Sequence, residues 1–300
     1  MRPLKRKGIA CRRSRRLFAP LCLFAKLVQT APVGYTFSMP NIEKHPAGAF
    51  CWIELATTDQ ESAKKFYCGL FGWTVEDSPI GPGDFYSMFR LNGNTTGAGC
   101  TLRKEQREQG VPPHWGVYME VAVADDAVAK AAKLGGTVSA PAFDVMDVGR
   151  MGVLQDPTGA DFCVWQSKKH SGMGVTGEDN AFCWADLSTP DPAKAGAFYE
   201  GLFGWTMVKD EKDPSGYLHI KNGEGFIGGI PPVAHRPPGS PAHWMIYFQA
   251  ADVEKSAARA AQLGGKILMP PRKMENVGDM AIVSDPQGAV FALFRSSRKG

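Results

Sequence analysis

The sequence predicts an α+β protein of two tandem domains, because blocks of it occur twice. The repeated blocks lie about 130 residues apart, which is the length of a domain and exceeds the period of roughly 20–50 residues found in solenoids. The clearest pairs are Gly69–Trp73 with Gly201–Trp205, Phe50–Trp52 with Phe182–Trp184, Leu134–Gly136 with Leu263–Gly265, and Asp156–Gly159 with Asp285–Gly288.

Composition shifts divide the chain into four segments. We expect a basic N-terminal extension at 1–47, a first domain at 48–166, a linker at 167–179 and a second domain at 180–296. The linker is polar and rich in glycine, so we expect it to be flexible and its His170 to be solvated.

Each domain reads as the order βαβββ, repeated. In the first half, a strand at 50–56 precedes a helix that Asp59 caps and that runs to about Leu70. In the second copy, Asp191 caps the matching helix and Pro192 takes its first position. The remaining strands of the first half are expected at 73–75, 85–91 and 97–102.

The second half of the domain repeats this order. A strand at 115–121 precedes an alanine-rich helix at 125–134, which Gly135 and Gly136 end. Further strands are expected at 137–138, 151–155 and 162–166, and the charged run at 104–108 is expected to be an exposed loop. Each sheet should bury one face beneath its helices and leave the other face to line a site.

The composition excludes several classes of function. The chain is 44% hydrophobic and 21% charged, as in ordinary globular proteins. Its net charge of +4 includes nine Lys and Arg before Met39, so the rest carries −5 and offers no nucleic-acid surface. No apolar run reaches the roughly 18 residues of a membrane span. Seven cysteines without a CxxC pair favour reduced thiols in the cytoplasm over disulfides or zinc.

The basic N-terminal extension of the chain has two interpretations. Ser14–Phe18 resembles a twin-arginine export signal, but Lys26 interrupts the apolar run that follows. The other interpretation, which we favour, is an upstream start codon, with Met39 as the true first residue of a cytoplasmic protein.

The repeated motifs resemble those of the vicinal oxygen chelate superfamily. Phe-Tyr-x-x-Leu-Phe-Gly-Trp follows the first helix, Leu-Gly-Gly the second, and Asp-Pro-x-Gly precedes the last strand, in both domains. This family includes glyoxalase I, bleomycin-resistance proteins and extradiol dioxygenases. The resemblance implies glyoxalase-like domains in which paired βαβββ modules form a cup around a small molecule. It implies no single activity, because one fold serves many chemistries.

Strand alternation assigns side chains to the two faces of each sheet. Cys51, Ile53 and Leu55 should pack beneath the helix, so Phe50, Trp52 and Glu54 should face the cup. By the same rule, the other expected cup residues are His114, Gly116, Tyr118, Glu120, Cys163, Trp165, Trp184, Asp186, His243, Met245, Tyr247, Gln249, Ala292 and Phe294. His219 is placed where the first domain has Phe89.

Metal-dependent members of the family place His or Glu on the first, fourth, fifth and eighth strands. In this sequence the matching positions hold Trp52, Gly116 and Cys163 in the first domain, and Trp184, Met245 and Ala292 in the second. These residues do not supply three or four nitrogen or oxygen ligands. We therefore expect neither metal nor cofactor, although a shifted site that uses Glu54 and His114 stays open.

The expected chemistry depends on isolated polar groups among aromatic ones. Candidate acid–base residues are Glu54, Asp186, His114 and His243, and each could instead steady the sheet through hydrogen bonds. Cys163 has no thiolate-activating partner in sequence and is not expected to be a nucleophile. The expected ligand-binding residues are Trp52, Tyr118, Cys163, Trp184, Met245 and Tyr247.

Three hypotheses of function follow, and the sequence leaves open whether the protein is an enzyme. The first is binding of a small apolar or aromatic molecule in a metal-free cup, by sequestration or with weak acid–base catalysis. The alternative is a metal-dependent glyoxalase-type lyase or extradiol-type dioxygenase. The third is an interaction protein with no catalytic site. We expect a monomer in which the duplication replaces a homodimer, with no nucleic acid or membrane as partner.

Overall fold

The two predicted domains are each an eight-stranded mixed sheet. The computed structural model describes residues 41–209, 215–275 and 277–297, so most of the predicted N-terminal extension lies outside the described residues. The strand orders are β2-β3-β4-β1-β5-β8-β7-β6 and β10-β11-β12-β9-β13-β16-β15-β14. The same order in both sheets confirms the α+β class and the tandem architecture.

The elements of the first domain follow the predicted βαβββ order. They are β1 (Phe50–Thr57), α1 (Gln60–Phe71), β2 (Thr74–Gly81), β3 (Asp84–Leu91), β4 (Asn94–Thr101), α2 (Lys104–Glu108), β5 (His114–Glu120), α3 (Ala124–Lys133), β6 (Thr137–Val145), β7 (Gly149–Gln155) and β8 (Asp161–Ser167). The charged run expected to be a loop is the short helix α2, and β6 is longer than the sequence predicted.

The second domain repeats this order with one 3-10 turn, η1, in place of α2. Its elements are β9 (Phe182–Ser188), α4 (Pro192–Phe203), β10 (Thr206–Lys209), β11 (Leu218–Asn222), β12 (Gly225–Ile230), η1 (Val233–His235), β13 (His243–Gln249), α5 (Val253–Gln262), β14 (Lys266–Met274), β15 (Gly278–Ser284) and β16 (Val290–Ser296). β9 and β13 occupy the centre of the sheet, as β1 and β5 do in the first domain.

The repeated Gly-Leu-Phe-Gly-Trp motif ends a helix and fills the core, as predicted. Asp59 caps α1 through a bond from the Ser62 amide, and the helix ends at Gly72 with φ 70°. Only glycine adopts this left-handed conformation without strain. The neighbouring Phe71 and Trp73 are both 3% exposed, so the motif has a structural role.

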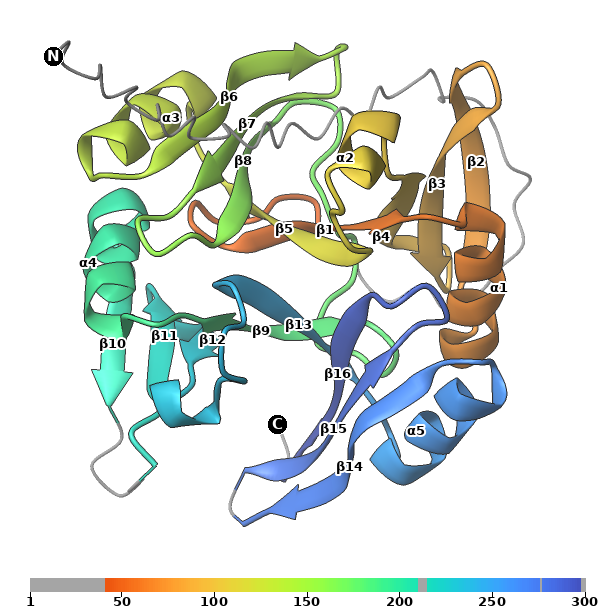
Figure 1. Ribbon diagram of the computed structural model, residues 1–300. Helices are drawn as coiled ribbons and strands as arrows, with labels where there is room; N and C mark the ends of the chain where they lie inside the picture. The colour runs from red at the N-terminus through yellow and green to blue at the C-terminus, as the bar shows by residue number, and fades with distance from the viewer. Residues whose placement is uncertain (1–40, 210–214, 276, 298–300) are drawn as a thin grey trace, which may run out of the picture.

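The two sheets pack back to back, with their central strands against each other (Figure 1). The ring centroids of Trp115 and Phe248 are 5.5 Å apart across this interface. α1 and α5 lie together on one side of the molecule and α3 and α4 on the other (Figure 1). The opposite faces of the two sheets, which we call the first and second cups, are therefore directed away from each other.

The prediction that Phe50 faces the first cup is wrong, because Phe50 lies in the interface between the domains. Its ring centroid is 5.2 Å from that of Trp244 in the second domain. The cause is a register shift between Phe50 and Trp52, so that Phe50 pairs with Met119 while Trp52 pairs with Tyr118. An extra residue in a strand breaks the alternation of its side chains.

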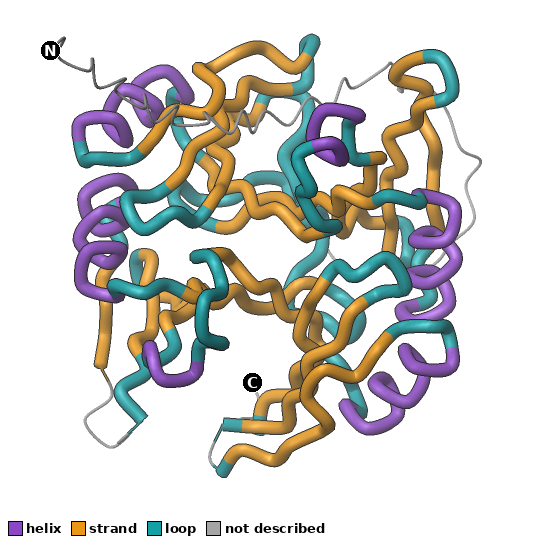
Figure 2. The backbone as a smooth tube through the Cα atoms, in the orientation of Figure 1, coloured by secondary structure: helices purple, strands orange, loops and turns teal. Residues whose placement is uncertain are grey.

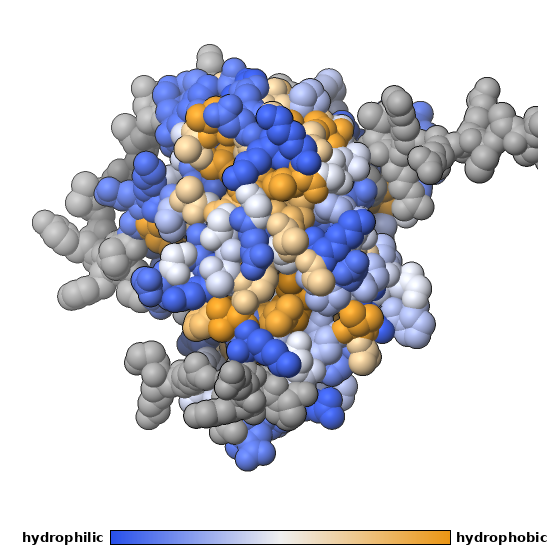
Figure 3. Space-filling model, turned by 90° about the vertical axis from the view of Figure 1, so that its left-hand side faces the viewer, coloured by the Kyte–Doolittle hydropathy of each residue, from blue (hydrophilic) through white to orange (hydrophobic). Residues whose placement is uncertain are grey.

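A groove marks the seam between the domains on the side of α3 and α4. It has a volume of about 370 Å³ and is lined by Leu134, Gly135, Pro157, Lys194, Ala197 and Phe198. Figure 3 shows this side of the molecule, where apolar residues reach the surface among hydrophilic ones. In the described part of the chain, no helix is long and apolar enough to cross a membrane.

Candidate functional site

The first cup is filled by its own side chains. Glu54 is 6% exposed and Trp52 is 3% exposed; Tyr118 donates to Glu54 Oε1 at 3.2 Å, and Trp52 Nε1 donates to the Tyr86 hydroxyl at 3.0 Å. The cavity that remains among them measures about 10 Å³, which is about enough for one water molecule. Its lining residues are Trp52, Glu54, Tyr86, Tyr118, Val145, Met151, Trp165 and His170.

The linker closes this cup, contrary to the flexible and solvated segment that we predicted. Residues 168–175, which we call the strap, fold back after β8. The Met173 amide donates to the Cys51 carbonyl at 2.7 Å, and the Gly174 amide to the Thr95 carbonyl at 2.7 Å. Met173 is fully buried. The strap is thus held by backbone hydrogen bonds, which its polar composition did not reveal.

His170 places its ring over the aromatic floor of the first cup. Its ring centroid is 4.6 Å from that of Trp52 in an edge-on arrangement, and Trp165 Nε1 donates to the His170 carbonyl at 3.0 Å. Burial lowers the pKa of His170 from 6.5 to about 4, with smaller contributions from the charges of Arg90 and His45. The ring is therefore neutral at physiological pH.

In the second cup, three hydrogen bonds converge on Asp186. Its Oδ1 accepts from Tyr217 at 2.5 Å and from Trp184 Nε1 at 3.0 Å, and its Oδ2 accepts from Tyr247 at 2.6 Å. Burial raises the pKa of Asp186, and the three donors oppose that rise by stabilising the carboxylate. Both tyrosines donate to Asp186, and the Tyr217 oxygen also accepts from Trp184 Nε1 at 2.9 Å. The Tyr247 oxygen therefore has more acceptor capacity left for a bound molecule than the Tyr217 oxygen.

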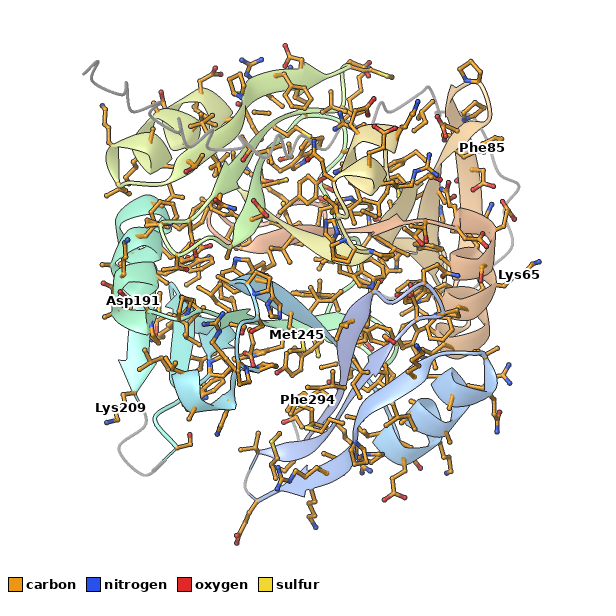
Figure 4. The ribbon with its side chains drawn as sticks, in the orientation of Figure 1. Lys65, Phe85, Asp191, Lys209, Met245 and Phe294 are labelled. Atoms are coloured by element: carbon orange, nitrogen blue, oxygen red, sulfur yellow. The ribbon has the colours of Figure 1, made fainter. Side chains whose placement is uncertain are left out.

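The side chains of the second cup are more exposed than their counterparts in the first. Trp52, Tyr86, Met151 and Trp165 are each at most 3% exposed, whereas the matching residues of the second domain are half-buried. These are Trp184, Tyr217, Met280 and Phe294. Met245 on β13 and Phe294 on β16 lie at the centre of this sheet (Figure 4). Half-exposed aromatic side chains around a buried carboxylate are typical of a ligand site.

His219 occupies the position of Met88, not that of Phe89 as the sequence suggested. It pairs with Gly229, which pairs with Asp186, just as Met88 pairs with Ala98 and Ala98 with Glu54. A register slip of one residue moves a side chain to the other face of a sheet. The corrected register places His219 on the cup face, where its charge contributes to the environment of Asp186.

His114 and His243 lie at the ends of their strands. The ring of His114 contacts the Pro112 carbonyl at 2.8 Å, and that of His243 contacts the Pro241 carbonyl at 3.0 Å. Their partners across the sheet are Ala56 and Ser188, one step along the cup face from Glu54 and Asp186. Burial lowers the pKa of His114, and His114 is outside the set of residues that lines the cavity around Glu54.

The row of cup residues expected to hold a metal in this fold carries a poor donor set. Of the predicted positions, Trp52 and Cys163 lie on one row, where both pair with Tyr118, and Gly116 lies beside Glu54 one step along the cup face. In the second domain, Trp184 and Ala292 both pair with Tyr247, and Met245 lies beside Asp186. The indoles of Trp52 and Trp184 and the methyl group of Ala292 do not coordinate divalent ions, so neither row supplies the three or four ligands that such a site needs. Among the residues that the structure describes, no three His, Cys, Asp or Glu side chains converge on a point suited to an ion.

Cys163 is set in the first cup but is not activated there. Its side chain is 7% exposed, and burial raises the pKa of its thiol, with a further contribution from the charge of Glu54. A thiol with a raised pKa is a poor nucleophile. Cys163 therefore contributes to the wall of the cup through packing.

Sequence reasoning missed four residues of the two cups. Tyr86 and Tyr217 were not assigned, although alternation along β3 from Met88 would have placed Tyr86 on the cup face. Met151 was treated only as part of a strand and Met280 was not assigned, yet each pairs with a cup residue, Trp165 or Phe294.

Comparison with known proteins assigns the chain to a family. A family model described as the Glyoxalase/Bleomycin resistance protein/Dioxygenase superfamily matches residues 49–164 and 182–293. The chain is 40% identical to the candidate glyoxylase CFP32 of Mycobacterium tuberculosis (strain CDC 1551 / Oshkosh), over 86% of this chain and 98% of that protein. It is 30% identical to the anthracycline biosynthesis protein DnrV of Streptomyces peucetius, over 82% and 92%.

Solved structures share the fold at low sequence identity. The Mn(II)-bound glyoxalase from Novosphingobium aromaticivorans has a TM-score of 0.60 at 13% identity, with 83% of this chain and 82% of that chain covered. The 2,3-dioxygenase LapB from Pseudomonas sp. KL28 has a TM-score of 0.56 at 13% identity, with 87% and 94% covered.

Proposed function

The chain belongs to the Glyoxalase/Bleomycin resistance protein/Dioxygenase superfamily, and we propose that it binds a small aromatic molecule in its second cup without a divalent metal. The observation that carries this proposal is the difference between the cups. Matching aromatic side chains are buried in the first domain and half-buried in the second, around Asp186. The first cup, with about 10 Å³ of free volume, acts as a structural element.

Asp186 supports binding better than it supports reaction. Asp186 is 4% exposed and its carboxylate has three hydrogen-bond donors, so it is already satisfied and fixes the positions of Tyr217 and Tyr247. The Tyr247 oxygen, and the remaining lone pair of the Tyr217 oxygen, would then accept hydrogen bonds from hydroxyl or amine groups of the bound molecule. The relation to a protein named for anthracycline biosynthesis supports a small-molecule ligand. The protein would act by sequestering that ligand inside the cell.

The alternative is a metal-dependent lyase or dioxygenase, and the residues of both cups argue against it. The positions that the family resemblance assigns to metal ligands hold Trp52, Gly116 and Cys163 in the first domain, and Trp184, Met245 and Ala292 in the second. Elemental analysis of the purified protein after dialysis against Ni²⁺, Zn²⁺, Mn²⁺ or Fe²⁺ distinguishes the two proposals. A stoichiometric ion whose retention depends on Glu54 or Asp186 would favour the alternative.

The binding proposal is tested with protein in which the seven tryptophans are replaced by 5-fluorotryptophan. Trp184→Phe and Trp52→Phe assign the two cup resonances in the fluorine spectrum. We expect aromatic ligands to shift the Trp184 resonance with saturation and to leave the Trp52 resonance unchanged. If a broad panel of aromatic phenols, acids and amines shifts neither resonance, the protein is not an aromatic-binding protein.

A further inference from the structure

Arg236 stands at the edge of the second cup. It follows η1 in the connection between β12 and β13, which runs along the open side of the lower sheet, where η1 is the short helical turn (Figure 2). Arg236 Nε donates to Ser188 Oγ at 3.2 Å, and Nη2 donates to the Ser240 carbonyl at 2.6 Å. The side chain is half-buried.

The bond to Ser188 fixes where the guanidinium lies. Ser188, Asp186 and Trp184 alternate along β9 and so share one face of the sheet. Trp184 and Asp186 line the cup, so the Ser188 hydroxyl and the guanidinium bonded to it lie on the same face, toward the end of the strand. His243 pairs with Ser188 across the sheet. Arginine, serine and histidine side chains thus gather on the cup face, one step from Asp186.

Among the described residues, the charge of Arg236 is not neutralised by a carboxylate. Within residues 41–209, 215–275 and 277–297, no carboxylate lies within 4 Å of this guanidinium. Its two hydrogen bonds go to neutral oxygens and use two of the five N–H donors of the side chain. A half-buried guanidinium with donors to spare is suited to bidentate binding of a carboxylate or phosphate.

The first domain lacks this arrangement. Counting back from the matched histidines His114 and His243, the counterpart of Arg236 is Arg107, which is exposed on α2. The counterpart of Ser188 is Ala56, which pairs with His114 and has no hydroxyl to hold a guanidinium. An arginine held by a serine at this position is therefore found at the more exposed second cup, and the matching residues of the first domain do not form such a pair.

We propose that Arg236, positioned by Ser188, binds the anionic group of the ligand in the second cup. The ligand would be an aromatic anion, with its rings against Trp184 and Phe294 and its charged group at the guanidinium. This inference rests on the proposed function, because it assigns the ligand class of the same site. Tyr217 and Tyr247 would contact any hydroxyl group at the other end of the molecule.

The experiment compares four probes of similar shape that differ in charge: naphthalene-2-carboxylate, naphthalene-2-carboxamide, 2-naphthyl phosphate and 2-naphthylmethylammonium. Affinity is measured by calorimetry, and the Trp184 fluorine resonance reports that each probe occupies the second cup. We expect the carboxylate or the phosphate to bind about tenfold more tightly than the carboxamide, as one charge-assisted hydrogen-bonded pair provides. The ammonium probe should bind most weakly. The ratio of carboxylate to phosphate affinity identifies which anion the site prefers.

Variants assign the preference to one side chain. Arg236→Ala should abolish the preference for the anion while the carboxamide binds as before, which also shows that the cup is intact. Arg236→Lys should keep part of the preference, because it keeps the charge without the planar fork. Ser188→Ala should weaken the preference, and the matched Arg107→Ala in the first domain should leave it unchanged.

Each outcome bears on the proposal. If all four probes shift Trp184 with equal affinity, or if Arg236→Ala keeps the anion preference, the inference is wrong while the binding function stands. If no probe shifts Trp184 at millimolar concentration, the result contradicts both the inference and the proposed function.

Discussion

The hydroxyl of Tyr67 donates a 3.1 Å hydrogen bond to the carboxylate of Asp285, which lies in the other domain. The same hydroxyl accepts from Trp115 Nε1 at 2.9 Å, so a tryptophan, a tyrosine and an aspartate form a buried chain across the interface. Tyr67 belongs to the repeated Phe-Tyr motif and Asp285 to the repeated Asp-Pro-x-Gly motif. Two motifs far apart in sequence therefore meet, and their repetition reflects the packing of two similar domains.

Tyr67→Phe should destabilise the protein without changing its fold. The substitution leaves the indole N–H of Trp115 and an oxygen of Asp285 without their partner in a buried site, which costs about 1–3 kcal/mol of unfolding free energy. Urea denaturation followed by circular dichroism measures this loss. The exposed Phe85 provides the control, because Phe85→Leu should change the unfolding free energy by less than about 0.5 kcal/mol. Equal stability of Tyr67→Phe and the unmodified protein would show that the chain contributes nothing.

Gly172→Ala should displace the strap from the first cup. Gly172 has φ 107°, and an added Cβ would lie 2.2 Å from the Cys51 carbonyl oxygen. The strap must then move, and we expect a loss of about 2 kcal/mol or more in unfolding free energy, as strained backbone positions cost. Acrylamide should also quench Trp52 and Trp165 more strongly.

Gly177→Ala is the matched control for this substitution. Gly177 also has a positive φ, of 74°, but an added Cβ there would meet nothing within 4 Å. Gly177→Ala should lower the unfolding free energy only by the backbone strain, about 1 kcal/mol, and should leave the quenching of tryptophan by acrylamide unchanged. If both variants lose the same stability and quench alike, the strap does not close the cup.

The arrangement of strands and helices was readable from the sequence, because apolar side chains alternate with period two along the strands and Asp59 marks the start of a helix. Trp52 and Trp184 lie on the cup faces as predicted. The bulge at Phe50 was not readable, since an extra residue in a strand leaves no mark in polarity. The position of the strap was not readable from the sequence either. Backbone amides of the strap, and not its side chains, donate the hydrogen bonds to Cys51 and Thr95.

The candidate site was only partly predictable for a related reason. Glu54 and Asp186 were found because a carboxylate on an apolar strand is conspicuous. Their tyrosine partners Tyr118 and Tyr247 were found by alternation along β5 and β13. Tyr86 on β3, which accepts from Trp52, and Tyr217 before β11 were missed, because which face they occupy depends on register. The difference in exposure between the two cups depends on the tertiary path of the linker, which no local pattern in the sequence encodes.

Acidification should destabilise the protein partly through His170. The pKa of His170 is lowered from 6.5 to about 4 in the folded state, so between these values the unfolded state binds the proton that the folded state does not. Stability that is present above pH 6.5 is therefore lost as the pH falls toward 4. The loss is at most about 3 kcal/mol, and partial exposure of the ring reduces it.

His170→Gln should make unfolding free energy less dependent on pH in this range. Urea titrations at pH 7, 6, 5 and 4.5 measure the slope of unfolding free energy against pH. The control is His235→Gln, at an exposed position, which should leave this slope unchanged. Asp186 and Glu120 act in the opposite sense, because burial raises their pKa values, so the comparison between variants matters more than the absolute curve. An unchanged slope in His170→Gln would show that its ring titrates as it does in the unfolded chain.

Asp186→Asn should impair ligand binding in the second cup, whereas Glu54→Gln in the first cup should not. An amide nitrogen in place of one oxygen cannot accept from both Tyr217 and Tyr247, so at least one hydroxyl must turn away from the carboxamide. The tyrosine oxygens would then be misaligned for the ligand, and we expect about a tenfold loss of affinity for a naphthol probe, the equivalent of one hydrogen bond. Calorimetry measures the affinity, and the Trp184 fluorine resonance confirms that binding stays in the second cup. A Glu54→Gln variant that loses the probe, with Asp186→Asn unaffected, would instead place the ligand in the first cup and require the strap to open.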